Sequence, residues 1–358
     1  LGALVKTSMN RCIQCTRCVR FSAEVCGTPE MGATGRGEDM EITTYLEQAL
    51  TSELQGNLVD ICPVGALTSK PYAFAARPWE LGKTQSVDVM DGIGSAIRVD
   101  TRGREVMRIL PRVNEAVNEE WISDKTRQIV DGLKRQRLDR PYVRENGKLR
   151  PASWTEAFAA IAAKAKSVAA EKIGALAGDL VSVEEMFALK QLAESLGSKN
   201  IDCRQDGSKL DPALGRASYI FNTTIEGIEQ ADALVIVGSN PRKEAAVLNA
   251  RILKRKRAGN FMTGVIGERA DLTYDCVNFG AGPESIATFV AQAPKDIARP
   301  MMIVGAAALA RPDGKAVLSA LAKAALDIGA VKDGWNGFNV LHTAASRVGG
   351  LRLRFVPG

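Results

Sequence analysis

The residues best suited to chemistry are four cysteines. Cys12, Cys15 and Cys18 fall in one run with two-residue spacers, and Cys62 lies far downstream, directly before Pro63. This C-x₂-C-x₂-C run with a remote Cys-Pro pair matches the ligand pattern of bacterial-type [4Fe–4S] clusters. Such a cluster needs one thiolate at each of its four iron corners, and a short loop can supply three of them. Pro63 has no N–H, so it suits the first position of a helix and fixes the backbone beside the ligand.

A structural zinc site is the competing interpretation, because zinc also binds four cysteines and often uses C-x-x-C pairs. Zinc ribbons usually present two separated pairs, whereas here three cysteines fall in one run and one stands alone. The spacing therefore favours one [4Fe–4S] cluster on Cys12, Cys15, Cys18 and Cys62 over zinc, and over four unligated thiols.

The other three cysteines show no repeating spacing. Cys26, Cys203 and Cys276 are scattered along the chain and do not form a disulfide framework, which indicates a reducing compartment. Cys26 falls outside the ligand spacing and is expected to be a small buried hydrophobe. We expect Cys203 and Cys276 to be buried structural thiols.

Arginines flank the cysteine run at positions 11, 17 and 20. Cations near a negatively charged cluster would stabilise its reduced form and raise its potential. Alternatively, Arg11, Arg17 and Arg20 are surface charges or form salt bridges to a partner. The sequence leaves both interpretations open.

Length and composition limit the class of protein. A chain of 358 residues suggests two or three domains, and 46% hydrophobic with 25% charged residues is typical of globular proteins. The net charge of +6 is mild and gives no reason to expect nucleic acid as a partner. The longest apolar runs, such as residues 301–310, are shorter than the roughly 20 residues that span a bilayer, so we expect no membrane span.

The single histidine, His342, excludes a metal site built from several histidines. It lies in an apolar, helical-looking stretch at residues 340–345 and is expected to pack or to form a hydrogen bond. Residues 1–8 are too few to shield a cluster, and residues 352–358 contain no closing element. We therefore expect the chain to be part of a longer protein.

The elements expected to position the cluster lie in residues 1–80. The pattern predicts a helix over 19–26 ending at Gly27, a strand over 40–46, a segment 54–61 leading to the fourth ligand, and a helical turn over 62–67. Residues 81–145 are predicted to be β-rich, with strands at 86–90, 96–100 and 105–110 and a hairpin turn through Gly103. A polar, basic stretch at 118–138 is expected to cross to the next domain.

Residues 146–358 alternate between predicted helices and strands, which indicates an α/β fold with a doubly wound, mostly parallel sheet. Ser153 with Glu156 and Ser182 with Glu185 form predicted capping boxes. A buried strand at 233–238 precedes a helix that should run from Pro241 to Arg257. Further elements are expected as strands at 173–177, 200–203, 262–266 and 301–304 and as a helix at 312–326.

Ligands of such sheets bind at the carboxyl ends of the strands, so residues 238–240 are the expected position of any second site. No G-x-G-x-x-G follows a predicted strand and no G-x-x-x-x-G-K-[ST] occurs, so the sequence does not establish nucleotide binding. The basic run at 254–257 is interpreted as the end of a helix, where cations complement the helix dipole.

The segments around the cysteines resemble a known family. Residues 9–21 and 60–72 closely resemble the largest iron–sulfur subunit of respiratory complex I, NADH:ubiquinone oxidoreductase. Residues 76–80, 107–112, 120–125, 132–137 and 233–242 share the likeness, which covers nearly the whole chain. The α/β part resembles the molybdopterin oxidoreductase superfamily.

The resemblance implies a function and a set of cofactors. Cys12, Cys15, Cys18 and Cys62 correspond to the ligands of one [4Fe–4S] cluster that relays electrons from NADH and flavin towards quinone. A [2Fe–2S] domain and a second, histidine-ligated [4Fe–4S] cluster would lie upstream, outside this chain, and the α/β domain would hold no molybdenum. The alternatives are a catalytic molybdopterin subunit of the formate dehydrogenase type and a structural module held together by metal.

The resemblance also implies partners and a location. The partners would be the flavin- and NADH-binding subunit, the [2Fe–2S] subunit and the quinone-side iron–sulfur subunits. The location would be the peripheral arm at the inner membrane, on the mitochondrial matrix side or the bacterial cytoplasmic side.

Overall fold

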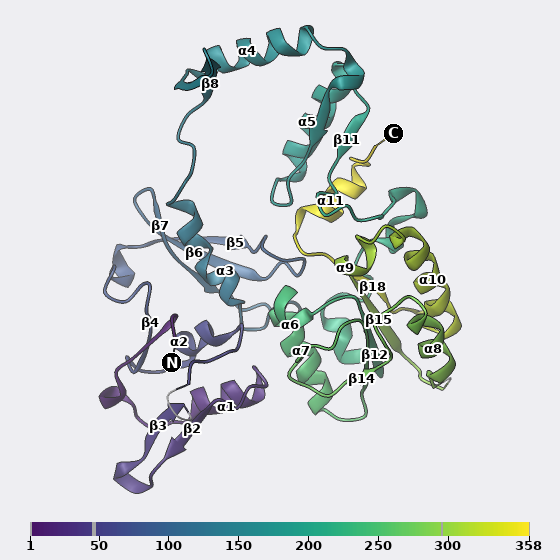
Figure 1. Cartoon of the computed structure of the whole chain (residues 1–358). Helices are drawn as coiled ribbons and strands as arrows, with labels where there is room; N and C mark the ends of the chain where they lie inside the picture. Colours follow the sequence, from purple (N-terminus) through teal and green to yellow (C-terminus); the bar gives the residue numbers. More distant parts are fainter. Residues whose placement is uncertain (1, 45–47, 295, 358) are drawn as a thin grey trace.

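Short apolar runs form the central parallel sheet of this computed structural model, which describes residues 2–44, 48–294 and 296–357. The strand order is β14-β13-β12-β15-β18, and every neighbouring pair is parallel (Figure 1). The strands are β12 (Ala233–Val237), β13 (Met262–Ile266), β14 (Val277–Asn278), β15 (Pro300–Gly305) and β18 (Phe338–Leu341). The predicted α/β fold class is confirmed.

Alternation along the strands sorts side chains into two cores. Leu234 and Ile236 of β12 face one core, which also contains residues of α7 (Ala246–Arg257). Val235 and Val237 face the other core, beneath α8 (Ser285–Gln292) and α10 (Gly314–Asp327). Because successive strand residues point to opposite faces, helices cover both sides of the sheet, as expected for a doubly wound fold.

Two predictions in this part of the chain are wrong. The helix expected from Pro241 to Arg257 is split into α6 (Pro241–Glu244) and α7, because Ala245 adopts a non-helical conformation with φ −149° and ψ 68°. His342 does not lie in a helix, because the residues before it form the parallel strand β18, which pairs with β15.

Residues 142–202 form elements outside the main sheet. The hairpin of β8 (Tyr142–Glu145) and β9 (Lys148–Pro151) crosses the domain boundary expected at residue 145. Both predicted capping boxes are present, at the starts of α4 (Trp154–Lys166) and α5 (Val183–Ser195). The predicted strands β10 (Gly174–Leu176) and β11 (Asn200–Asp202) pair in parallel with each other in a separate two-stranded sheet.

The cysteine-bearing part begins with β1 (Val5–Thr7), which pairs antiparallel with β4 (Leu67–Ser69). The predicted helix near Cys18 is present as α1 (Arg17–Glu24), and Gly27 after it has a φ of +70°. The predicted strand is present as β3 (Glu41–Thr44), paired with β2 (Met31–Thr34), and positions 45 and 46 lie outside the described residues.

The helical turn expected over residues 62–67 is wrong. Cys62 caps α2 (Leu58–Ile61) with an extended backbone, φ −71° and ψ 114°. The Ser8 N–H donates to the Ala66 carbonyl at 2.8 Å, and Leu67 pairs with Thr7. The backbone after Cys62 therefore joins a strand ladder with the start of the chain, which is incompatible with a helix.

The predicted β-rich segment is a three-stranded antiparallel sheet, and its hairpin turn contains Gly103 at φ +60°. Its strands are β5 (Gly82–Val87), β6 (Ala96–Arg102) and β7 (Glu105–Pro111). The stretch expected to be a polar crossover instead contains α3 (Asp124–Gln128) and buries Asn118, Thr126 and Arg127. Hydrogen bonds to these polar side chains make their burial possible.

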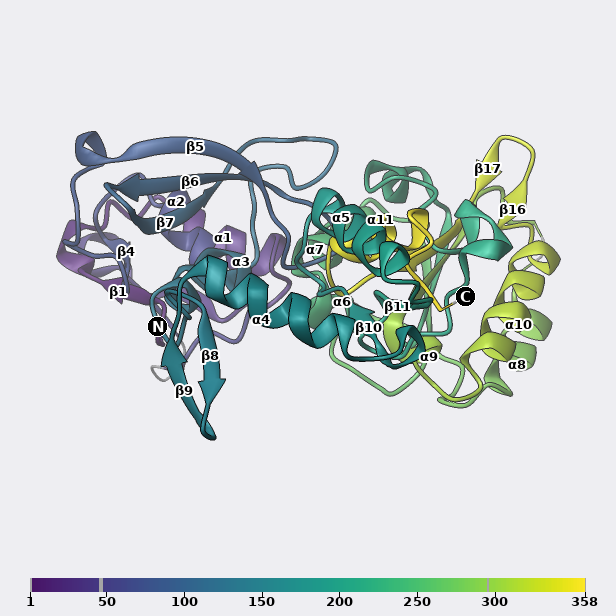
Figure 2. The ribbon, with the colours of Figure 1, turned by 90° about the horizontal axis from the view of Figure 1, so that it is seen from above.

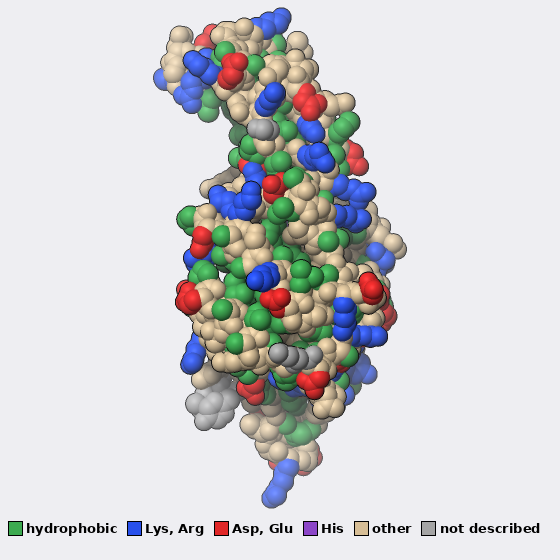
Figure 3. All heavy atoms as spheres, turned by 90° about the vertical axis from the view of Figure 1, so that its right-hand side faces the viewer, with side chains coloured by type: hydrophobic (Ala, Val, Ile, Leu, Met, Phe, Trp, Pro, Cys, Tyr) green, Lys and Arg blue, Asp and Glu red, His purple; other side chains and the backbone are tan. Residues whose placement is uncertain are grey.

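The cysteine-bearing part packs against the sheet through the face that carries α7. Phe21 and Leu58 belong to the same hydrophobic core as Leu248 and Ile252 of α7. Figure 2 shows the two parts as neighbouring lobes. The face with α8 and α10 is open to solvent, and there basic and acidic side chains are interspersed among hydrophobic ones (Figure 3).

The remaining described elements are short. They are α9 (Ala306–Leu309), α11 (Ser346–Arg352), β16 (Val331–Lys332), β17 (Trp335–Asn336) and the 3₁₀ turns at Met9–Arg11, Gly37–Asp39, Gln55–Asn57, Pro78–Glu80, Ile129–Leu133, Ala170–Lys172, Pro212–Leu214, Arg216–Ser218 and Glu226–Gln230. No helix in the described part of the chain combines the length and apolarity that crossing a bilayer requires.

Two leucines of α10 provide a matched test of the packing. Leu321 is 0% exposed beneath the sheet, whereas Leu326 on the same helix is 62% exposed. We expect Leu321→Ala to lower the free energy of unfolding by about 2–4 kcal/mol, because it leaves a cavity, and Leu326→Ala to lower it by less than about 0.5 kcal/mol. Urea denaturation followed by circular dichroism measures both. Equal losses would contradict the packing described.

Candidate metal centre

All four predicted ligands line one small cavity. Cys12, Cys15, Cys18 and Cys62 surround it together with apolar residues that include Ile42 and Leu67. Cys12 and Cys15 come from the loop before α1, Cys18 from the first turn of α1, and Cys62 from the end of α2. The structure therefore brings together side chains that lie far apart in the sequence.

Two left-handed residues shape the cysteine loop. Gln14 has a φ of +55° and Thr16 a φ of +58°, and both lie between predicted ligands. These turns curl the backbone so that the flanking cysteines face the same cavity, and α1 begins immediately afterwards. Left-handed non-glycine residues are uncommon and occur most often where the surrounding structure enforces them.

The thiols are mutually destabilising when charged. Burial raises the pKa of the Cys18 thiol, and the nearby Cys12 and Cys15 raise it further. Backbone hydrogen bonds from Val19 and Cys18 lower the pKa of Cys18 less, and the Gln14 N–H donates separately to the Cys12 Sγ at 3.3 Å. Four thiolates in one cavity therefore require bound cations, and iron or zinc would supply the positive charge.

The donor set fits an iron–sulfur cluster. No three His, Cys, Asp or Glu side chains within the described ranges are grouped to hold a single metal ion. A four-iron cluster makes a different demand, because each thiolate binds a separate iron at one corner of a larger body. Four cysteines lining a common cavity meet that demand, and no other side chain on the lining is a strong metal ligand.

The segment that carries Cys62 is held by residues that the sequence analysis missed. Asn57, which is 0% exposed, exchanges two hydrogen bonds with the backbone of Ile122, donating to the carbonyl at 2.8 Å and accepting from the N–H at 3.1 Å. Arg127 donates to Asn57 Oδ1 at 3.1 Å and pairs with Asp60 at 2.5 Å. A single sequence carries no signal for these contacts, because the partners are about 65–70 positions apart.

The three arginines beside the loop are exposed to solvent. Arg11, Arg17 and Arg20 form no ion pair within the part of the chain that the structure describes. The Arg11 guanidinium lies against Gly65, where an added Cβ would meet its Nη1 at 3.1 Å. Their charge therefore remains available beside the cysteine loop.

The remaining cysteines lie away from this cavity. Cys26 and Cys203 are buried as predicted, and burial raises the pKa of Cys26 to about 12 and of Cys203 to about 11. Cys276 is only half-buried, so the prediction of burial is wrong for it. Cys276 lies at the start of the short edge strand β14, where few residues cover it.

His342 is a buried hydrogen-bonding residue, as predicted. Its Nε2 lies 2.6 Å from the Tyr219 carbonyl, and burial lowers the pKa of the imidazole. The neutral side chain therefore donates to the carbonyl.

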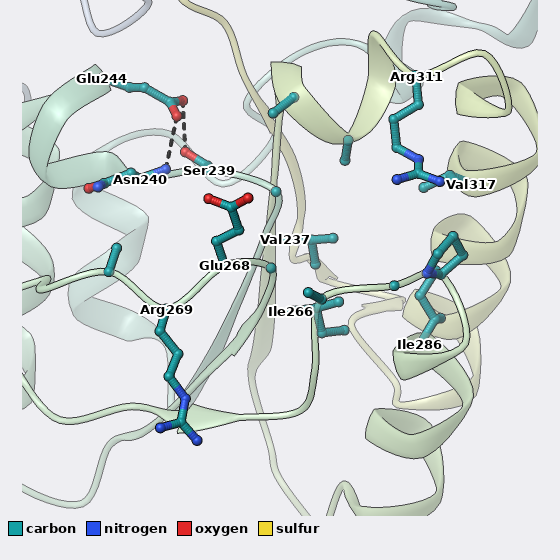
Figure 4. Close-up of a pocket in the computed structure, with 18 residues that line it drawn as sticks. Val237, Ser239, Asn240, Glu244, Ile266, Glu268, Arg269, Ile286, Arg311 and Val317 are labelled. Carbon is teal, nitrogen blue, oxygen red and sulfur yellow. Dashed lines mark hydrogen bonds between the residues drawn. The ribbon is translucent and has the colours of Figure 1, made fainter.

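A second cavity of about 510 Å³ lies where the sequence predicted it, at the carboxyl ends of β12 and β13 (Figure 4). Its lining includes Ser239, Asn240, Glu244 and Glu268. The Ser239 hydroxyl donates to Glu244 at 2.8 Å, and the Asn240 N–H donates to the other carboxylate oxygen at 2.9 Å. Glu244 therefore satisfies two of the donors in the turn after β12.

Comparison with known proteins identifies the class. Residues 137–358 match the family model "Molybdopterin oxidoreductase", which covers more than half of the chain, so the chain belongs to the molybdopterin oxidoreductase family. Residues 2–68 match the ferredoxin-like domain of NADH-quinone oxidoreductase subunit 3. Residues 81–131 match the 4Fe-4S domain described as NADH-ubiquinone oxidoreductase NDSU1/NuoG-like.

Within that class, the chain is similar to large subunits of one complex. It is 53% identical to an NADH-quinone oxidoreductase subunit of Rickettsia felis, over 99% of this chain and 54% of that protein. It is 50% identical to the mitochondrial NADH-ubiquinone oxidoreductase 78 kDa subunit of Neurospora crassa, over 99% of this chain and 49% of the relative. The potato iron-sulfur protein 1 of NADH dehydrogenase is 49% identical, over the whole chain and 49% of its own length.

These relatives confirm the resemblance seen in the sequence. The chain spans about half the length of the curated relatives that it matches.

Membership of this family implies a pterin cofactor, and the lining of the second cavity meets only part of what such a cofactor needs. Molybdopterin carries a phosphate, which needs donors such as free N–H and hydroxyl groups. In this cavity the Ser239 hydroxyl and the Asn240 N–H already serve Glu244, and Glu268 adds another carboxylate, whereas Arg269 and Arg311 on the same lining are cations that could bind a phosphate. Neither Cys203 nor Cys276 lines the cavity, so its lining offers no thiolate to ligate molybdenum.

Asp124 makes the region around α2 sensitive to pH. Burial raises the pKa of Asp124 from 3.8 to about 6, and the hydrogen bond from the Gly56 N–H and the charge of Arg127 lower it less. The folded state therefore holds the Asp124 proton more tightly than the unfolded chain does. Because protonation stabilises the folded state here, stability from this group is present at low pH and is lost as the pH rises through about 6.

We expect the free energy of unfolding to fall by up to about 3 kcal/mol between about pH 4 and pH 7 from this group alone. Asp124→Asn keeps an acceptor for Gly56 but cannot titrate, so it should flatten that part of the profile. Asp327→Asn, at the exposed end of α10, should leave the profile unchanged. Denaturation series across this pH range measure wild type and both variants. A curve for Asp124→Asn that runs parallel to the wild-type curve would refute the assignment.

Proposed function

We propose that this chain is the electron-relaying part of the large iron–sulfur subunit of an NADH:quinone oxidoreductase. Cys12, Cys15, Cys18 and Cys62 would hold one [4Fe–4S] cluster, which supplies one-electron transfer when bound. The observation that carries the proposal is the single cavity lined by all four cysteines, in a segment that matches ferredoxin-like and 4Fe-4S family models.

The residues of the chain hold the cluster and control its surroundings. Ile42 and Leu67 restrict water on the inner side of the cavity, while Ile13, 61% exposed, marks its outer side. Arg11, Arg17 and Arg20 place positive charge beside the loop and would favour the reduced state. Such control of charge and solvent access sets the potential of a protein-bound cluster.

The longer relatives support further cofactors and partners for the whole protein. We propose a [2Fe–2S] cluster and a histidine-ligated [4Fe–4S] cluster outside this chain, and contacts with the flavin- and NADH-binding subunit, the [2Fe–2S] subunit and the quinone-side iron–sulfur subunits. Electrons would enter from flavin and leave towards quinone. The location would be the peripheral arm at the inner membrane, on the matrix or the bacterial cytoplasmic side.

The α/β domain would serve as scaffold rather than as a catalytic centre. The lining of the second cavity contains no cysteine to ligate molybdenum, which argues against a formate dehydrogenase-like activity. For the domain division we propose residues 1–80, a β-rich segment from 81, and an α/β domain that begins before the β8–β9 hairpin, near residue 137. This moves the boundary that the sequence pattern places at residue 145, so that the hairpin stays in one domain.

The proposal is tested by counting iron and sulfide in anaerobically purified protein and recording EPR spectra before and after dithionite. We expect about four irons per chain and a reduced-state S = ½ signal. Cys62→Ser should lose most of this signal, because one iron corner loses its thiolate. Cys276→Ser, which alters a half-buried thiol outside the cavity, should retain it.

Zinc in place of iron, with no EPR signal in either state, would refute the proposed electron relay and favour a structural metal module. Bound molybdenum, or pterin fluorescence after denaturation, would instead favour the catalytic alternative. Equal loss of signal in Cys62→Ser and Cys276→Ser would refute the assigned ligand set.

A further inference from the structure

We propose that Arg127 is the positioning residue for Cys62: it fixes α2 from the neighbouring β-rich segment, and cluster retention at the Cys62 corner depends on it. This inference rests on the proposed function, because it concerns the same cluster. It assigns a role to a residue that touches neither a ligand side chain nor the cavity lining.

The ligand end of α2 needs an external anchor. The helix spans only Leu58–Ile61, and an isolated helix of that length is unstable in water. No side-chain hydrogen bond caps its N-terminus, because the Asn57 side chain points to other partners. The position of Cys62 therefore depends on what holds Asn57 and Asp60.

Arg127 contacts both ends of this short helix. Its Nη2 donates to Asn57 Oδ1 at 3.1 Å, before the helix, and to Asp60 Oδ2 at 2.5 Å, two residues before the ligand. The Arg127 side chain is 7% exposed and that of Asp60 is 30% exposed. An ion pair that is largely shielded from water is strong, and removing one partner leaves the other charge without an opposite charge beside it.

A second set of contacts holds the same segments together. The Asp124 carboxylate accepts from the Gly56 N–H at 2.7 Å, and the Asp124 N–H donates to the Glu53 carbonyl at 2.9 Å. Gly56 also lets the arginine approach, since an added Cβ would lie 2.7 Å from Arg127 Cδ. The backbone before α2 thus lies directly against α3 and its arginine.

The other three cysteines are fixed independently. Cys12 and Cys15 belong to the loop between β1 and α1, Cys18 lies in the first turn of α1, and Phe21 of the same helix packs on Trp121 with ring centroids 4.9 Å apart. Losing the Arg127 contacts would leave these three in place and loosen Cys62 alone. Residues that orient metal ligands from outside typically change metal affinity by about 10- to 100-fold when removed.

The test measures loss of one iron from the cluster in the full chain. Ferricyanide takes one electron from [4Fe–4S]²⁺, which releases one Fe²⁺ and leaves [3Fe–4S]⁺, and bathophenanthroline captures the released iron. We expect Arg127→Met to lose the first iron about 10- to 100-fold faster than wild type and to accumulate the [3Fe–4S]⁺ EPR signal. Arg127→Lys keeps a cation near Asp60 but lacks the planar guanidinium. Its rate of iron loss should therefore lie between those of wild type and Arg127→Met.

Arg251 provides a matched control. Its side chain is 4% exposed, donates to the Glu115 and Val117 carbonyls and pairs with Glu229, and its Nε is unpartnered, as is that of Arg127. These contacts lie away from α2. We expect Arg251→Met to lower thermal stability as Arg127→Met does but to release iron within about twofold of the wild-type rate.

Each outcome is decisive. Equal iron release from Arg127→Met and Arg251→Met, with wild type slower, would show a general stability effect and overturn the positioning role. Equal rates of iron release from Arg127→Met and wild type would also overturn the positioning role of Arg127. Wild-type protein without iron would overturn the proposed function and this inference together. If Arg127→Met does not fold, Asp60→Asn removes the same ion pair more gently, and a wild-type rate in that variant overturns the proposal.

Discussion

The structure depends on one constraint: four cysteine side chains from two distant stretches of chain must line a single cavity. A short loop with left-handed turns can gather three of them, because each is two residues from the next. Cys62 has no such local means, since it follows a helix of four residues. The antiparallel pairing of β1 with β4 on one side and the buried contacts of Asn57 and Arg127 on the other bring Cys62 to the cavity.

The α/β part also helps to hold the segments that carry the four cysteines, because it packs against α1 and α2. Its sheet is covered by α8 and α10 on one face, while the other face, with α7, shares a hydrophobic core with α1 and α2. Polar contacts cross the same junction, because Arg242 pairs with Glu53 and Lys125 donates to the Glu244 carbonyl. The large domain thereby stabilises the small one, which alone would have little apolar area to bury.

The crevice at the carboxyl ends of the strands lies at the position where open α/β sheets bind ligands. The sheet order reverses beside β12, and a cavity lies there, as in other open α/β sheets. Glu244 nevertheless accepts the hydrogen bonds that the turn could offer to an anion. Arg269 and Arg311 also line this cavity, and membership of the family alone does not imply a reaction on this chain.

The sequence by itself determined the ligand candidates, the α/β class, the two capping boxes and the position of the second cavity, because each depends on neighbouring residues or on a local hydrophobic period. Only the tertiary structure decided the conformation after Cys62, where pairing with β1 replaces the expected helical turn, and the break in the helix at Ala245. It also decided that the polar stretch around Arg127 is buried against α2. These features rest on contacts between residues far apart in the chain, which local propensity cannot encode.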